Sequence, residues 1–512
     1  MSEEGLNKEA YKALEDVVGP DYISNAPAIL DSYAYSFKGS GDLFNPRFAA
    51  VILPKETVEV QAIVRLCNKY GLQYKAASTG WGSRGSGGMI WMDLRRMNRI
   101  IEINEKNMFA VVEPYVIGGQ LQAELMKRGL NYNVIGAGAN CSALPYAAHY
   151  GGGHMSETTS LRERNILGAE WVTPDGEIIR MGSLGSIGEW FCADGPGPSL
   201  RGLTLGTTSP MGAMGVFTKA AMKLYPWAGP TPYPLEGHSP RFYTNEMPPN
   251  CLYRYFSFPT AEDMQEALRR ISENEIAYEI MGFSAAMLAS NITTSNEEDY
   301  ACCEQFLEEM QGPGFQVIII GNSPRDFEFK KKLLERIIDD TNGESLKSVE
   351  DPDIAGGMLW RSIRITASAR ECFRAGGAFG VVLGGSHPYN EELRFVKQVV
   401  EIKKEWIKKG VLRDDHGGYL TWTHEHGHLG HAETLFQFVK GPEAEEATKD
   451  LMQKGMQIAI DSHYGVTLMV ADQLHYMFGP HTCNYHLWMK KIKQKFDPNE
   501  AAEPSGFISG KK

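Results

Sequence analysis

A glycine-rich segment between Ser78 and Gly88 constrains the fold of this chain more than any other stretch, because five of its eleven residues are glycine. Glycine lacks a Cβ and tolerates positive φ, so the backbone N–H groups of such a loop can converge on phosphate oxygens. Arg84 adds a cation that can contact the same group. A pyrophosphate-binding loop and an ordinary turn both fit this segment alone, so the elements around it decide.

Those elements predict a strand, a helix and a second strand before the loop. Residues 51–54 are an apolar run, and residues 56–70 place apolar side chains at helical spacing before Gly71. Three β-rich runs and a helix are predicted after the loop, at 90–94, 99–103, 109–113 and about 118–128. A Rossmann fingerprint should follow the first strand and open a helix. Here the glycines follow a second strand and lead into more strands, which argues against a Rossmann unit.

Similarity to a known family rests on blocks at 54–70, 78–80, 96–106, 111–114, 165–177, 212–226 and 496–499. Together these blocks resemble the FAD domain of the vanillyl-alcohol oxidase and p-cresol methylhydroxylase flavoproteins, a family that includes glycolate and D-lactate dehydrogenase-type subunits. The resemblance implies an α+β fold with a two-part FAD-binding domain, residues 1–228 and 471–512, and an α+β cap over 229–470 that binds the substrate. The proline-rich stretch 226–234 is the predicted boundary. Within the cap, helical patterns at 261–274 and 391–409 alternate with strand-like runs at 316–320 and 418–422.

Composition is that of an ordinary globular chain, with 43% hydrophobic and 22% charged residues among 512. The net charge of −12 argues against nucleic acid as a partner. No apolar run is long enough to span a bilayer and the first residues are acidic, so we expect no membrane span, no secretory signal and a cytoplasmic location. Eight scattered cysteines form no iron–sulfur ligand set, so any iron–sulfur relay would belong to a partner protein. We expect a homo-oligomer or a subunit of a larger complex.

The strongest chemical cluster is the histidine-rich stretch 417–431. If 420–428 is one strand, its period of two places His424, His426 and His428 on one face. These imidazoles can act as bases or substrate contacts at a flavin. Alternatively, with His431 as a further candidate, they bind a divalent metal, or they are structural histidines at a polar strand edge. The base interpretation is preferred, and a metal is not favoured.

Two further candidates depend on the resemblance. His149 stands where phenol-oxidising members keep an aspartate beside flavin N5, although it can equally anchor a loop. The helix pattern at 360–364 resembles a carboxylate-binding motif, so Arg361 and Arg364 are candidates for gripping an anionic substrate, with a solvated helix face as the alternative. The tyrosine–arginine clamp that holds phenolate in phenol-oxidising members has no counterpart at the matching positions, although Tyr464 is one residue that can compensate.

The resemblance also implies a set of cofactor contacts. We expect FAD to be held by Ser78, Thr79, Gly80, Trp81, Gly82, Ser83, Arg84 and Gly85 at the pyrophosphate, by Ser142, Pro145, Tyr146, His149 and Gly151 along the ring, by Gly215, Val216 and Thr218 at the adenine end, and by Asn499. The loop has no histidine between Gly80 and Gly88, where one covalent class attaches its flavin, so noncovalent FAD is expected.

The function implied is an FAD-dependent oxidoreductase, a dehydrogenase rather than an oxidase. It would oxidise a hydroxylated small molecule, a 2-hydroxyacid or related alcohol, by hydride transfer to flavin N5. Electrons would pass to an iron–sulfur or other electron-transfer partner. Two alternatives stay open: an oxygen-using oxidase of an aromatic alcohol or phenol, and an FAD-holding electron-transfer subunit with no substrate of its own.

Overall fold

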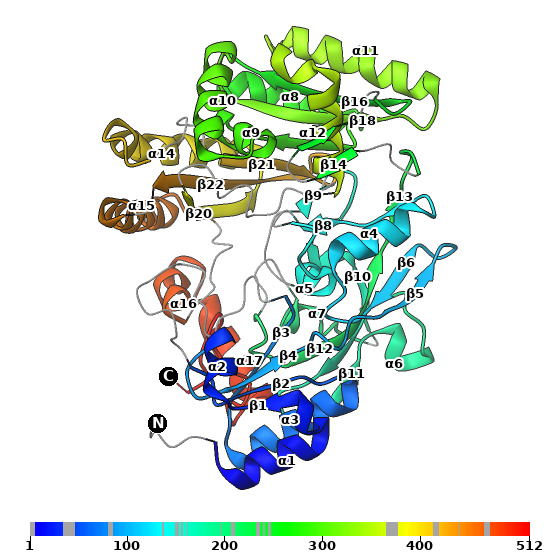
Figure 1. Ribbon diagram of the computed structural model, residues 1–512, viewed down its shortest axis with the longest axis vertical. Coiled ribbons are helices and arrows are strands. Elements are labelled where there is room, and N and C mark those ends of the chain that lie inside the picture. Colours follow the sequence, from blue (N-terminus) through cyan, green and yellow to red (C-terminus); the bar gives the residue numbers. More distant parts are fainter. Residues whose placement is uncertain are drawn as a thin grey trace.

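The computed structural model describes residues 6–33, 47–79, 85–135, 138–148, 153–154, 157–160, 162–195, 197–205, 210–231, 236–238, 241–243, 247–364, 377–412, 419–439, 441–464 and 472–511. The chain folds into a lower part, which holds both termini, and an upper part made of the middle of the sequence (Figure 1). No helix in these ranges is both long and apolar enough to cross a membrane.

The lower part begins with a four-stranded sheet in the order β1-β2-β4-β3. Its strands are β1 (Ile23–Ser24), β2 (Ala50–Ile52), β3 (Tyr74–Ala77) and β4 (Ile90–Asp93), with β2 and β3 both parallel to β4. Helices α1 (Lys8–Val18) and α3 (Thr57–Tyr70) cover it, and α2 (Pro27–Tyr33) precedes β2. Helix α3 buries Val60, Ile63, Val64 and Cys67, the helical stripe that the sequence predicts, and ends at Gly71 with φ of 65°.

A second, antiparallel sheet of the lower part has the order β11-β10-β12-β6-β5. Its strands are β5 (Ile100–Asn104), β6 (Phe109–Val112), β10 (Ile166–Val172), β11 (Ile178–Arg180) and β12 (Val216–Lys223). Helices α4 (Gly118–Met126) and α5 (Ala143–Ala148) lie above it toward the upper part (Figure 1). Short elements complete this region: β7 (Leu130–Asn131), β8 (Val134–Ile135), β9 (Gly153–His154), α6 (Ser183–Ile187), α7 (Arg201–Thr204) and β13 (Tyr225–Pro226).

The upper part is built on a seven-stranded sheet in the order β19-β16-β18-β17-β21-β22-β20. Its strands are β16 (Cys251–Ser257), β17 (Glu279–Gly282), β18 (Gly314–Ile320), β19 (Glu344–Ser345), β20 (Gly377–His387), β21 (Tyr419–His424) and β22 (Leu429–Val439). One face packs on α9 (Ala285–Ile292) and α12 (Pro352–Arg364), and the other on α8 (Ala261–Glu273), α11 (Pro324–Asp340) and α14 (Tyr389–Lys408). Helix α10 (Asn296–Glu309) packs on α9, and α15 (Pro442–Asp461) on α14.

The chain returns to the lower part through α16 (Asp472–Phe478) and α17 (Tyr485–Phe496). Ala502 bridges to Tyr74 beside β3, and the backbone N–H of Tyr74 donates a 2.8 Å hydrogen bond to the carbonyl of Ala501. Two buried lysines hold this return in place. Lys75 Nζ lies 3.3 Å from Glu503 Oε2, and Lys493 Nζ donates to the carbonyls of Ala213 and Ala502.

The predicted α+β fold is confirmed, and the helices and strands that the sequence predicts along the lower part all form within a few residues of their expected limits. The structure supports the two-part lower domain, because its ends meet beside β3. We therefore propose 1–228 and 471–512 as one domain and 229–470 as the cap.

Candidate functional site

Strand β3 delivers the start of the glycine-rich loop. Ser78 and Thr79 follow its last residue and are half-buried, while Gly80, Trp81, Gly82, Ser83 and Arg84 lie outside the described residues. At the far end, Gly85 packs closely on Met89, because a Cβ there would lie 1.9 Å from the terminal methyl carbon of that flexible side chain. The loop therefore leaves the carboxyl end of a parallel strand, the edge at which open parallel sheets bind ligands.

Ser142 is one sign of a ligand in the lower part. It is buried at the start of α5, and its Oγ has no hydrogen-bond partner among the described residues. A buried hydroxyl without a partner is costly, so a ligand oxygen or nitrogen is the natural complement. Pro145 and Tyr146 follow on the same helix, whereas His149 and Gly151 lie outside the described residues. This buried hydroxyl, together with the glycine loop, fits a bound FAD.

The predicted adenine-end residues are tightly built into the sheet. Gly215 has φ of 100°, and a Cβ there would lie 2.2 Å from the carbonyl oxygen of Val172. Val216 is buried in the core beside β2 and β4, and the Thr218 hydroxyl donates to Glu170 Oε1 at 3.1 Å. These positions therefore have structural roles in β12 and just before it, and their contact with a cofactor stays a prediction.

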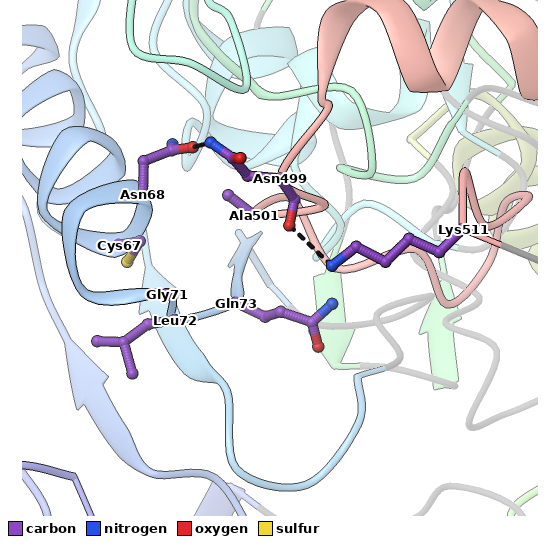
Figure 2. Close-up of a pocket in the computed structure, with 8 residues that line it drawn as sticks. All are labelled: Cys67, Asn68, Gly71, Leu72, Gln73, Asn499, Ala501 and Lys511. Atoms are coloured by element: carbon purple, nitrogen blue, oxygen red, sulfur yellow. Dashed lines mark hydrogen bonds between the residues drawn. The ribbon is translucent and has the colours of Figure 1, made fainter.

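Asn499 lies at the opposite end of β3 from Ser78. Its side-chain amide donates a 3.0 Å hydrogen bond to Asn68 Oδ1, and its carbonyl accepts one from Lys511 Nζ (Figure 2). The small pocket there has a volume of about 210 Å³ and is lined by Cys67, Asn68, Gly71, Leu72, Gln73, Asn499, Ala501 and Lys511. Because β3 runs from this pocket to the glycine loop, the structure separates Asn499 from Ser78 and Thr79 by the length of a strand.

The prediction of one strand through His428 is wrong. Strand β21 ends at His424, and the next four residues form the turn of a β21–β22 hairpin. Glu425 and His426 have φ of 50° and 54°, so the period of two breaks there. His426 and His428 lie exposed in the turn instead of sharing a face with His424.

A different histidine pair is formed inside the hairpin. His424 and His431 are both buried, and their ring centres lie 6.0 Å apart with the planes at 76°. The register pairs Trp422 with His431 and with Met281, which places these histidines on the same sheet face as Met281. That face packs in a cluster that includes Met126 and Trp227 of the lower part. The buried pair is thus on the side of the cap that faces the lower domain.

A metal interpretation gains no support from this geometry. In the described ranges, no three His, Cys, Asp or Glu side chains converge in a way that could hold a metal ion. Two of the four candidate histidines are in the exposed turn and two are in the sheet.

Arg361 is buried in α12, only 3% exposed, so the solvated helix face is wrong for this residue. Its positive charge acts on Tyr253, whose hydroxyl donates to Gln316 Oε1 at 3.1 Å. Gln316 in turn donates to the Ser362 hydroxyl. Arg364 is the last residue of α12, and its side chain lies outside the described residues. A buried guanidinium among polar groups can bind a carboxylate through its fixed fork.

Sequence reasoning missed Tyr253, Gln316 and Glu157. Tyr253 and Gln316 sit in strands whose other residues are mostly apolar, and only the sheet register shows that they share a face with Met281. Glu157 is fully buried at the boundary between the two parts and contacts the histidine hairpin. No periodic pattern or motif surrounds Glu157, so the sequence offered no signal for it.

Tyr464 does not replace the missing phenolate clamp. It packs in the cluster between α14 and α15, with its ring 5.0 Å from that of Phe395. Arg394 donates to its hydroxyl at 3.2 Å. Tyr464 thus belongs to the outer helices rather than to the face that carries His424.

Comparisons with known proteins agree with this architecture. Residues 48–182 match the model of the FAD binding domain family. A probable mitochondrial D-lactate dehydrogenase from Danio rerio is 23% identical over 61% of this chain and 56% of its own length. The chain spans about half the length of the curated relatives it matches.

Two solved structures resemble nearly the whole chain. One, p-cresol methylhydroxylase with substrate bound, superposes with a TM-score of 0.78 at 16% identity, covering 98% of both chains. The other, 4-ethylphenol oxidase from Gulosibacter chungangensis in complex with isoeugenol, has a TM-score of 0.72 at 20% identity and covers 99% of both. The match at 48–182 and the shared fold therefore indicate a chain that carries an FAD-binding domain. The chain is thus similar in sequence to FAD-linked oxidoreductases and has the fold of p-cresol methylhydroxylase and 4-ethylphenol oxidase.

Proposed function

We propose that the protein is a dehydrogenase with noncovalent FAD that oxidises an anionic small molecule of the 2-hydroxyacid class. The observation that carries this proposal is the buried pair His424 and His431 on the cap face turned toward the FAD-binding domain. The relative from Danio rerio, named as a probable D-lactate dehydrogenase, supports the substrate class. When bound, FAD supplies the acceptor for the hydride that leaves the substrate carbon.

The side chains of this chain have separate roles in that reaction. Ser78, Thr79 and Gly85 belong to the loop that holds the phosphates, and Ser142 Oγ hydrogen-bonds the cofactor. Arg361 binds the substrate carboxylate, because a buried guanidinium gains most from an anionic partner. A ring nitrogen of His424 takes the proton from the substrate hydroxyl oxygen, and His431 holds the imidazole in place. Such proton transfer typically contributes about 10² to 10⁴ in rate.

A second candidate is oxidation of an aromatic alcohol or phenol with oxygen as acceptor. It is favoured by the likeness to p-cresol methylhydroxylase and 4-ethylphenol oxidase over nearly the full chain. The packing of Tyr464 among the outer helices counts against it, since this tyrosine is not placed to bind phenolate.

The decisive experiment is anaerobic titration of the purified flavoprotein with 2-hydroxyacids and, separately, aromatic alcohols. Bleaching of the flavin absorbance by a 2-hydroxyacid, followed by slow reoxidation in air, is the expected result. Bleaching by an aromatic alcohol with fast peroxide formation would move the assignment to the oxidase. Flavin that no compound bleaches, but that a protein electron donor reduces, would identify an electron-transfer subunit. A protein that binds no FAD would contradict all three.

A further inference from the structure

Glu157 lies where the FAD-binding domain meets the tip of the cap hairpin. Its side chain is 0% exposed, although glutamate is seldom fully buried without a partner. Its backbone carbonyl accepts a 3.0 Å hydrogen bond from the N–H of His426. Its carboxyl accepts a hydrogen bond from the Thr423 hydroxyl, and its other oxygen lies 3.9 Å from His426 Nδ1. One residue of the lower domain therefore holds the hairpin through both backbone and side chain.

Glu157 makes the buried contacts between the FAD-binding domain and the hairpin, whereas a neighbouring ion pair is exposed. Ser272 of α8 also faces the carboxyl. Among the described residues, the titratable groups that face it are His426 and Glu275, which lies just beyond α8. On the same turn, Glu425 forms an ion pair with Arg164, but the Arg164 side chain is 48% exposed. Exposed pairs of this kind contribute little to stability, because water screens the two charges. The hydrogen bonds of Glu157 are thus the buried contacts of this attachment.

The attachment acts directly on the histidine pair. Thr423 precedes His424 in β21, and alternate residues of a strand point to opposite faces. Fixing Thr423 on one face therefore fixes the place of His424 on the other. His431 is tied to the same unit through its cross-strand neighbour Trp422.

We propose that Glu157 is a positioning residue that anchors the β21–β22 hairpin to the FAD-binding domain and so sets where His424 and His431 stand relative to the flavin. The effect on catalysis rests on the proposed function, whereas the anchoring does not. The turn benefits from such an anchor, because Glu425 and His426 both have positive φ, a conformation that is costly for non-glycine residues.

The anchor is pH-dependent. Burial raises the pKa of Glu157 to about 7, against 4.5 for an ordinary glutamate, with Glu275 adding to this effect and the hydrogen bonds opposing it. The docked hairpin thus favours the protonated carboxyl. Docking is strongest below about pH 4.5, weakens as the pH rises toward 7, and then stays constant.

Hydrogen–deuterium exchange of the FAD-loaded protein tests the anchor without relying on activity. We expect Glu157→Ala and Thr423→Val to speed amide exchange in 419–432 about tenfold, the effect of one lost buried hydrogen bond, with FAD content unchanged. Glu157→Gln keeps an acceptor for Thr423, so its exchange at neutral pH should stay within about threefold of wild type. Its protection, corrected for intrinsic exchange, should lose the wild-type decline between pH 5 and 7. Glu308→Gln, at an exposed position of α10 away from the hairpin, is the matched control and should leave the hairpin unchanged.

Wild-type protection of the hairpin in both Glu157→Ala and Thr423→Val would overturn the proposal. If Glu157→Ala does not fold, Thr423→Val and the pH dependence of Glu157→Gln decide. The failures are distinguishable. If the protein binds no FAD, but Thr423→Val still lowers the protection of the hairpin, the anchor is supported and the proposed function is contradicted. In the opposite case, a 2-hydroxyacid bleaches the flavin at the same rate in wild type and in Glu157→Ala, and amide exchange of the hairpin is also the same in both. That result would support the proposed function and contradict the anchor.

Discussion

The side-chain amide of Gln122 donates a 2.8 Å hydrogen bond to the backbone carbonyl of Ile363. Gln122 belongs to α4 of the FAD-binding domain and Ile363 to the last turn of α12 in the cap. Both residues are fully buried, so the bond is protected from water. It fixes the end of the helix that carries Arg361 against the lower domain, which is where a substrate anion between the two domains would need a cation.

Replacing Arg361 by lysine should weaken substrate binding more than it slows turnover. Lysine keeps the charge but loses the planar fork, so we expect KM for a 2-hydroxyacid to rise about 10- to 100-fold while kcat changes less. Steady-state kinetics on both parameters checks this. A neutral alcohol of similar size serves as control, because its KM should not depend on the fork. Equal KM values for the acid in both proteins would remove Arg361 from the substrate site.

The His424→Asn variant should bind FAD normally but reduce it slowly. Loss of a positioned base costs about 10² to 10⁴ in rate, and anaerobic stopped-flow measurement of flavin bleaching gives that rate directly. His428→Asn is the matched control, since His428 lies exposed in the turn and should leave the rate unchanged. A larger fall in the bleaching rate in His428→Asn than in His424→Asn would indicate that His428, and not His424, is the base.

Ser142→Ala should separate cofactor affinity from stability. The Ser142 hydroxyl is buried without a partner among the described residues, so its removal should not lower the melting temperature of the apoprotein. The same change removes a hydrogen bond to the cofactor and should weaken FAD binding about 2- to 10-fold. Thermal denaturation of the apoprotein and quenching of flavin fluorescence provide the two values. A destabilised apoprotein with unchanged FAD affinity would assign Ser142 a purely structural role.

Lys493→Met should strongly destabilise the protein. Lys493 is fully buried, donates to the carbonyls of Ala213 and Ala502, and pairs with Asp497 at 2.5 Å. Removing one partner leaves a buried carboxylate unpaired, which typically costs about 3 to 5 kcal/mol of unfolding free energy.

The exposed neighbour Lys495 provides the control for that variant. Lys495→Met should stay within about 0.5 kcal/mol of wild type in urea denaturation. Equal stability of the two variants would show that the Lys493 pair does not hold the C-terminal return.

The fold was largely predictable because its signals are local. The stripe of Val60, Ile63, Val64 and Cys67 fixes α3, and the glycines after β3 exclude a Rossmann unit. The site was less predictable because it depends on turns and long-range contacts. The hairpin turn after His424 contains no proline and only one glycine, Gly427, so nothing in the sequence marks where the alternation breaks. Burial of Arg361 depends on the packing of α12 against β16, a strand about a hundred positions earlier in the chain.

The bridge between Tyr74 and Ala502 also bears on how the protein is made. A ribosome releases the whole cap before it releases the segment that covers the edge of β3, since Lys75 and Glu503 are 428 residues apart. Until then the first sheet has an open edge, which is prone to pairing with other chains. Early folding of the cap shortens the effective loop that must close and lowers its entropic cost. A chain whose translation stops shortly before Glu503 would therefore have a folded cap and a lower domain that is prone to aggregate through the open edge of β3.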